Sequence, residues 1–111
     1  MEEEKGEVQE YDAPVYGGHC YWVSYNKGKE PEVDCWEARS WGLTEEEFYD
    51  LAYRCRAMQY EHEFVYGEDD HKLVYDTYFK RRENAEHFLE LLRQASNEKQ
   101  SRVKLGRVYK Q

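Results

Sequence analysis

Three consecutive cations, Lys80, Arg81 and Arg82, stand out because the 111-residue chain is otherwise acidic, with a net charge of −8. They fall where the sequence predicts that a strand ends and a helix begins. The free N–H groups and dipole of a helix N-terminus attract anions, so the triplet is a candidate site for a phosphate or another anionic ligand. Cations are locally unfavourable at that end of a helix. We therefore favour the alternative in which nearby acids, such as Glu83 and Glu86, neutralise them.

The histidines and cysteines form no pattern typical of a metal centre or of a catalytic nucleophile. Neither C-x-x-C nor H-x-x-x-H spacing occurs, and no glycine-rich loop matches a phosphate-binding motif. Cys55 falls on the apolar face of a predicted helix, which is typical of a packed, inert thiol. We expect no metal, no cofactor and no catalytic residue, so the sequence leaves enzymatic activity open but does not favour it.

Acidic and tyrosine side chains form the more conspicuous candidate surface. Eleven residues are tyrosine, a type enriched at protein-binding surfaces, although a half-exposed sheet face is the interpretation that we favour for them. Acids cluster in the first turns of a predicted helix and at the tip of a predicted hairpin. The candidate partner-binding residues are Glu45, Glu46, Asp50, Glu68, Asp69, Asp70 and Tyr78.

These surfaces predict a small, non-enzymatic protein-binding module that acts as a regulator or inhibitor. The acidic body could imitate a polyanion and occupy the basic groove of a nucleic-acid-handling protein, as inhibitors that phages deploy against host defences do. The net charge opposes direct binding to nucleic acid or to anionic membranes. The alternative is a small-molecule or phosphate-ligand domain, catalytic or not, that uses Lys80, Arg81 and Arg82.

Charge and cysteine content suggest how the chain is organised and where it acts. Residues 1–12 hold six acids and one lysine, and residues 93–111 hold six bases and one acid. We expect residues 1–12 to be disordered and residues 13–111 to form one domain. Its basic end, as a strand or tail, would fold back on the acidic body. Three cysteines without an apolar leader favour a reducing, cytoplasmic location, and exposed strand edges are compatible with a homodimer.

Periodicity predicts the elements that must position these residues. A strand at 19–25 would pair with a shorter strand at 33–38. Thr44 and Glu47 form a capping-box pattern, and Leu43 and Phe48 form a hydrophobic staple, so a helix should follow Thr44. Alternating residues on both sides of 67–71 predict a hairpin, after which a helix should extend from about 82 to Asn97. A last basic strand is expected at 101–110.

This order of elements predicts an α+β fold. The simplest arrangement is an antiparallel sheet of four or five strands with two helices packed on one face, ferredoxin-like (split βαβ) or a variant of it. Many unrelated functions occur on that fold, so the fold itself does not identify one.

Overall fold

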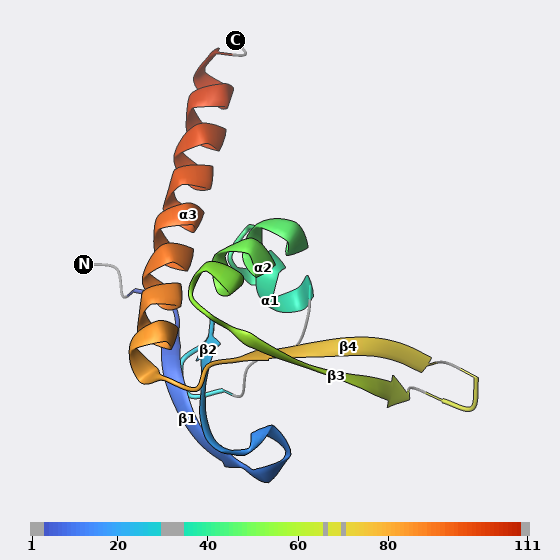
Figure 1. Ribbon diagram of the computed structural model, residues 1–111. Coiled ribbons are helices and arrows are strands. Elements are labelled where there is room, and N and C mark those ends of the chain that lie inside the picture. Colours follow the sequence, from blue (N-terminus) through green and yellow to red (C-terminus); the bar gives the residue numbers. More distant parts are fainter. Residues whose placement is uncertain (1–3, 30–34, 66, 70, 110–111) are drawn as a thin grey trace.

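The computed structural model describes residues 4–29, 35–65, 67–69 and 71–109. Two β-hairpins and three helices follow one another along the chain (Figure 1). In order, the elements are β1 (Glu7–Ala13), the short 3-10 helix η1 (Pro14–Tyr16), β2 (Gly18–Ser24), α1 (Cys35–Ser40), α2 (Glu45–Arg54), β3 (Met58–Val65), β4 (His71–Tyr78) and α3 (Arg82–Tyr109).

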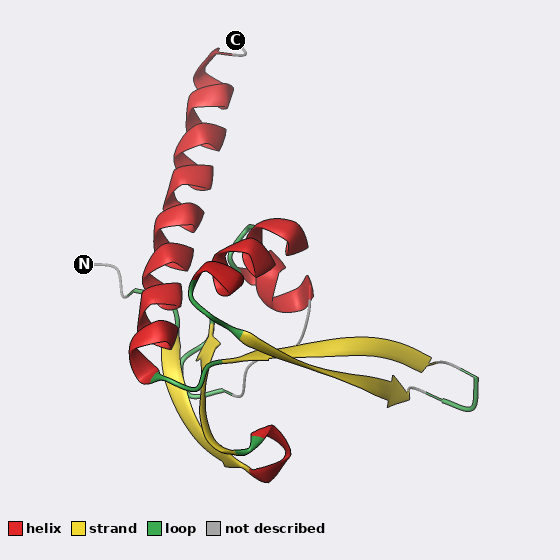
Figure 2. Ribbon diagram, viewed as in Figure 1, coloured by secondary structure: helices red, strands yellow, loops and turns green. Residues whose placement is uncertain are grey.

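The strands form two separate antiparallel sheets of two strands each, β1–β2 and β3–β4. A single bridge joins them, in which Tyr21 and Phe79 exchange two backbone hydrogen bonds of 2.8 Å. The expected four- or five-stranded sheet with two helices on one face is therefore wrong. Beyond this bridge β3 and β4 run away from β2 instead of lying alongside it (Figure 2).

The N-terminal segment differs from the expectation of disorder over residues 1–12, because its second half forms β1. Arg93 of α3 donates hydrogen bonds to the carbonyl oxygens of Lys5 (2.9 Å) and Gly6 (3.1 Å) and pairs with Glu4 (3.0 Å). Gly6 has a φ of +86°, and a Cβ there would lie 2.7 Å from the Trp41 ring. One cation thus anchors the acidic segment; residues 1–3 lie outside the described part.

The expected strand at 33–38 is also wrong, because residues 35–38 begin helix α1 and residues 33 and 34 lie outside the described part. Ala38 is buried in the core, and the Glu37 carboxylate accepts a hydrogen bond from the backbone N–H of Tyr25 (2.6 Å). This contact joins α1 to the end of β2. Such a partner satisfies an otherwise costly buried carboxylate.

The expected C-terminal strand at 101–110 is wrong as well, because α3 continues without interruption to Tyr109. No proline follows residue 82, and Gly106 costs a helix only about 1 kcal/mol relative to alanine. The helix therefore has no strong stop signal near Asn97. Residue 110 lies outside the described part.

Helix α2 confirms the prediction from its capping pattern. The Thr44 hydroxyl accepts a hydrogen bond from the Glu47 N–H (3.1 Å), and the Thr44 N–H donates to the Glu47 carboxylate (3.0 Å). Lys99 of α3 also contacts this carboxylate at 2.5 Å. The hydrogen bond from Lys99 and, to a smaller extent, the one from the Thr44 backbone N–H lower the pKa of Glu47 to about 2. One side chain thus caps α2 and connects it to α3.

The core lies where α3 packs against the β1–β2 hairpin, α1 and α2 (Figure 1). Phe88 of α3 lies at its centre, with ring centroids 5.2 Å from Phe48 and 5.3 Å from Phe79. Trp41 and Leu92 are also buried there. The β3–β4 hairpin contributes to this core at its base and then extends away from it.

Candidate functional site

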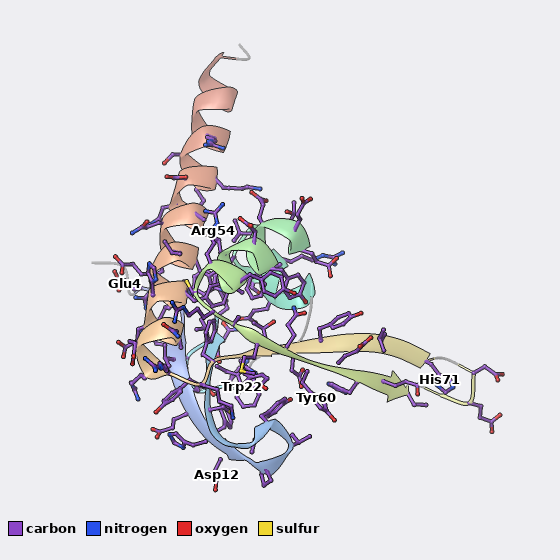
Figure 3. The ribbon with its side chains drawn as sticks, viewed as in Figure 1. Glu4, Asp12, Trp22, Arg54, Tyr60 and His71 are labelled. Carbon is purple, nitrogen blue, oxygen red and sulfur yellow. The ribbon has the colours of Figure 1, made fainter. Side chains whose placement is uncertain are left out.

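An aromatic cluster fixes the base of the β3–β4 hairpin to the tip of the β1–β2 hairpin. Tyr16 of η1 packs on the rings of Tyr78 (centroids 4.6 Å apart), Trp22 (4.9 Å) and Tyr60 (5.3 Å). Its hydroxyl donates a hydrogen bond to the Asp76 carboxylate. Figure 3 shows Trp22 and Tyr60 in this region. We call the cluster the hairpin joint; it consists of Tyr16, Trp22, Tyr60, His62, Asp76 and Tyr78.

The hairpin joint holds a tyrosine, an aspartate and a histidine close together. Their contacts connect the two hairpins and do not form a catalytic arrangement. His62 Nε2 lies 3.2 Å from Asp76 Oδ2 without hydrogen-bond geometry. Burial, and then the hydrogen bond to Asp76, raise the pKa of Tyr16 far above its ordinary value. Tyr16 therefore stays protonated at neutral pH and remains a donor. The Tyr16 ring packs edge to face on Trp22 and Tyr60 and at a tilt on Tyr78, which joins the two hairpins.

The opposite face of the β3–β4 hairpin points away from the hairpin joint. Residues directly opposite in the register share a face, and faces alternate along each strand. Because Tyr60, Asp76 and Tyr78 face the joint, the residues between them face the other way. We call this side of the hairpin the outer face; it consists of the exposed residues Glu61, Glu63, Val65, His71 and Leu73 together with the half-buried Tyr75.

The outer face combines acids with exposed apolar side chains. Val65 is 55% exposed and Leu73 is 51% exposed on this face. The Glu63 carboxylate contacts the His71 ring, and the Tyr75 hydroxyl donates to Glu61 (3.4 Å). His71 lies near the far end of the hairpin (Figure 3). This surface can offer both charge and apolar contact to a partner.

The structure separates the acids that the sequence grouped as one candidate surface. Glu45, Glu46 and Asp50 are exposed on α2, and Asp50 pairs with Arg54 at 2.9 Å. Glu68 and Asp69 are exposed in the turn between β3 and β4, at the far end of the hairpin (Figure 1). These are two distinct acidic regions. Asp70 lies outside the described residues.

Tyr78 does not contribute to an outward surface, which corrects the sequence interpretation. It is only 7% exposed, because it lies beneath Tyr16 in the hairpin joint. The sequence analysis missed Tyr16 and Asp76. The alternation of β4 does place Asp76 on the same face as Tyr78. If that face is covered, the Asp76 carboxylate needs a hydrogen-bond partner there.

The Lys80–Arg81–Arg82 triplet has internal partners for each of its cations. Lys80 donates to the carbonyl oxygen of Tyr16. Arg81 lies 3.7 Å from Glu83, and Arg82 donates to Glu86 at 3.1 Å. The nearby acids are therefore in place to neutralise the cations at the start of α3. No described contact favours the anionic-ligand hypothesis.

The remaining chemistry-bearing side chains also have structural surroundings. Cys20 and Cys55 are free and buried, and burial raises the pKa of both thiols. Among the described residues, no three histidine, cysteine or acidic side chains are placed to hold a metal ion. In the same part of the chain, no helix combines the length and the apolar character that crossing a bilayer requires.

Comparison with known proteins identifies no relative. The chain matches no family model, no curated protein and no solved structure. A function can therefore be inferred only from the surfaces described above, and the outer face of the β3–β4 hairpin combines exposed apolar side chains with acids.

Proposed function

We propose that this protein is a non-enzymatic module that binds another protein through the outer face of the β3–β4 hairpin and so regulates or inhibits it. One observation carries the proposal. The β3–β4 hairpin extends from the body of the molecule, and Val65 and Leu73 of its outer face are exposed. A two-stranded hairpin alone in water is marginally stable at best, so this extension gains most from a partner that covers it.

The strand edges support the same proposal. Outside the Tyr21–Phe79 bridge, β3 and β4 have no further strand neighbour among the described residues. Exposed edges present backbone N–H and C=O groups, to which a partner can add a strand. Side chains of the outer face would then select among such partners.

Charge indicates the class of partner. Residues 58–78 contain six acids and one lysine, which gives this hairpin a net charge of −5. A basic surface complements it, and association would be fast and sensitive to salt. A nucleic-acid-handling protein presents such a surface, so we propose that the hairpin occupies its basic groove. The buried free thiols of Cys20 and Cys55 fit a reducing compartment such as the cytoplasm.

Affinity capture from nuclease-treated lysate of the source organism tests this function. The wild type should retain specific proteins at low salt and release them at high salt. Glu61→Lys/Glu63→Lys should lose at least tenfold of that capture. Glu45→Lys/Glu46→Lys makes the same charge change on α2 and should lose much less. Equal capture by the wild type and the hairpin variant would refute the proposal, and equal loss in both variants would reduce it to an effect of net charge.

A further inference from the structure

The bridge between β2 and β4 shows in which direction the backbone groups of the β3–β4 hairpin point (Figure 1). In an antiparallel strand, the N–H and C=O of one residue point to the same side, and those of the next residue point to the other side. Phe79 directs both groups to Tyr21 of β2. This side of β4 is the one away from β3, because Met58 of β3 already lies opposite the neighbouring Tyr78. The base of the outer edge of β4 is therefore occupied by β2.

The same alternation identifies the residues on the outer edge of β3. Because Phe79 points away from β3, the even-numbered residues of β4 direct their backbone groups toward β3, and their even-numbered partners in the register direct theirs toward β4. The odd-numbered residues of β3 therefore direct N–H and C=O away from the hairpin. We call these four residues the β3 edge: Gln59, Glu61, Glu63 and Val65. Within the described ranges, no other strand pairs with the β3 edge.

The β3 edge offers acidic side chains together with its backbone groups. Glu61, Glu63 and Val65 also belong to the outer face and are exposed. The printed contacts of the two carboxylates, with Tyr75 and His71, come from β4 and not from the edge side. A strand that pairs with the edge places one side chain directly opposite each carboxylate. Opposite charges in such a pair are stabilising and like charges are destabilising, so the edge favours two basic residues separated by one residue.

A second copy of this chain is a poor partner for the β3 edge. Antiparallel pairing of two β3 edges about a two-fold axis at His62 would use all of their outward backbone groups. In that register Glu61 of each copy lies opposite Glu63 of the other, which joins like charges twice. The net charge of −5 on residues 58–78 also makes the two hairpins repel each other. Charged residues protect natural edge strands from self-association in the same way, and here they leave the edge selective for a basic strand.

We propose that an extended basic segment of the partner adds to the β3 edge as an antiparallel third strand. Its basic residues lie opposite Glu63 and Glu61, and an apolar residue lies opposite Val65. Along the partner chain, the pattern is an apolar residue followed by basic residues two and four positions later. Backbone hydrogen bonds supply the affinity, and the alternate side chains supply the selectivity. This inference rests on the proposed function, because it uses the same hairpin, and it specifies the form in which the partner presents its basic surface.

Two synthetic peptides of identical composition test this arrangement by two-dimensional NMR of the full, isotope-labelled chain. In the alternating peptide, one valine and two lysines occupy every second position in the proposed order, and threonine occupies the others. In the control peptide the two lysines are adjacent, so that only one of them can point to the outer face. The alternating peptide should bind at least threefold more tightly. It should shift the backbone amide signals of Glu61, Glu63 and Val65 more than those of the β4 residues opposite them.

Two substitutions of Glu63 separate strand addition from simple attraction between charges. The N–H of Glu63 points away from β4, so Glu63→Pro removes an outward donor without removing a hydrogen bond of the hairpin ladder. Glu63→Ala lacks the same carboxylate but keeps the N–H. Glu63→Pro should therefore bind the alternating peptide at least tenfold more weakly than Glu63→Ala. Circular dichroism and thermal melts check that both variants are folded.

Equal affinities of these two variants would overturn the added strand, as would equal binding of the two peptides or no binding of either at about 1 mM. Shifts of the β3 edge signals when the protein alone is concentrated would assign the edge to a second copy and would also overturn it. If capture from lysate depends on Glu61 and Glu63 but the peptide tests fail, only the strand addition is wrong. If the peptides bind as expected but capture does not depend on these acids, only the proposed function is wrong.

Discussion

The two hairpins have the same local construction but different surroundings. Each is a pair of antiparallel strands, seven residues long in β1–β2 and eight residues long in β3–β4. In the first, β2 contributes to the core from both faces, since Cys20 and Ser24 are buried on one and Val23 on the other. In the second, Tyr78 at the base is the buried residue among those whose burial is described. Two strands can therefore pair in the same way whether or not they belong to the core.

The core at the base of the β3–β4 hairpin should tolerate substitution least. Phe79 is fully buried and packs on Phe88. Phe79→Ala should lower the free energy of unfolding by about 3–5 kcal/mol, because it removes a large buried ring and leaves a cavity. Urea denaturation measures the change, with the exposed Tyr53→Ala as the control. An effect below about 1 kcal/mol would show that the two hairpins do not share one core.

The next largest loss of stability is expected from the hydrogen bond between Tyr16 and Asp76. Tyr16→Phe keeps the ring contacts but removes the donor to the buried Asp76 carboxylate, so we expect a loss of about 1.5–3 kcal/mol. The same substitution in an Asp76→Asn background should cost much less, because the charged acceptor is gone. Equal costs in both backgrounds would mean that this hydrogen bond does not hold the joint.

A matched pair of valines tests the contrast between the hairpins directly. Val23 is 5% exposed and Val65 is 55% exposed. Val23→Ala should cost about 2 kcal/mol, from the loss of two buried methyl groups and the cavity left behind. Val65→Ala should change stability by less than about 0.5 kcal/mol. Similar costs at the two positions would break the distinction between a covered and an exposed hairpin.

Alkaline pH should produce the smallest effect. The pKa of Tyr16 is raised from an ordinary 10.0, so the folded state keeps a proton that the unfolded state loses. The contribution of Tyr16 to stability is therefore complete below pH 10 and is lost as the pH rises above it. In thermal melts between pH 9 and 11, Tyr16→Phe should lose stability with pH less steeply than the wild type. Parallel curves would contradict the raised pKa.

The sequence predicted those elements whose signals are local. The Thr44 cap, the β3–β4 turn and the start of α3 each depend on residues close together in the chain, and all three are confirmed. Strand β1 instead pairs with β2, and Arg93, far along the chain, binds the backbone of Lys5 and Gly6 just before it. No periodicity in residues 1–12 records that contact. The pairing of strands into sheets was wrong for the same reason.

The candidate surface was predicted only in part. The acids at the hairpin tip, Glu68 and Asp69, are exposed as expected. The prediction that Tyr78 is exposed was wrong. The alternation of residues along a strand shows which side chains share a face, but not which face is covered. Glu61 and Glu63 were not among the candidates that the sequence suggested, since only the register shows that they face away from the hairpin joint.

The bridge between Tyr21 and Phe79 has a consequence for how opening of the molecule can be observed. Its two hydrogen bonds are the backbone pairing that joins the hairpins within the described ranges. The amide proton of Phe79 can therefore exchange with solvent deuterium only when the hairpins separate, whereas amides at the edges of β3–β4 exchange without that event. Comparing these exchange rates would measure the free energy with which the exposed hairpin stays docked to its body.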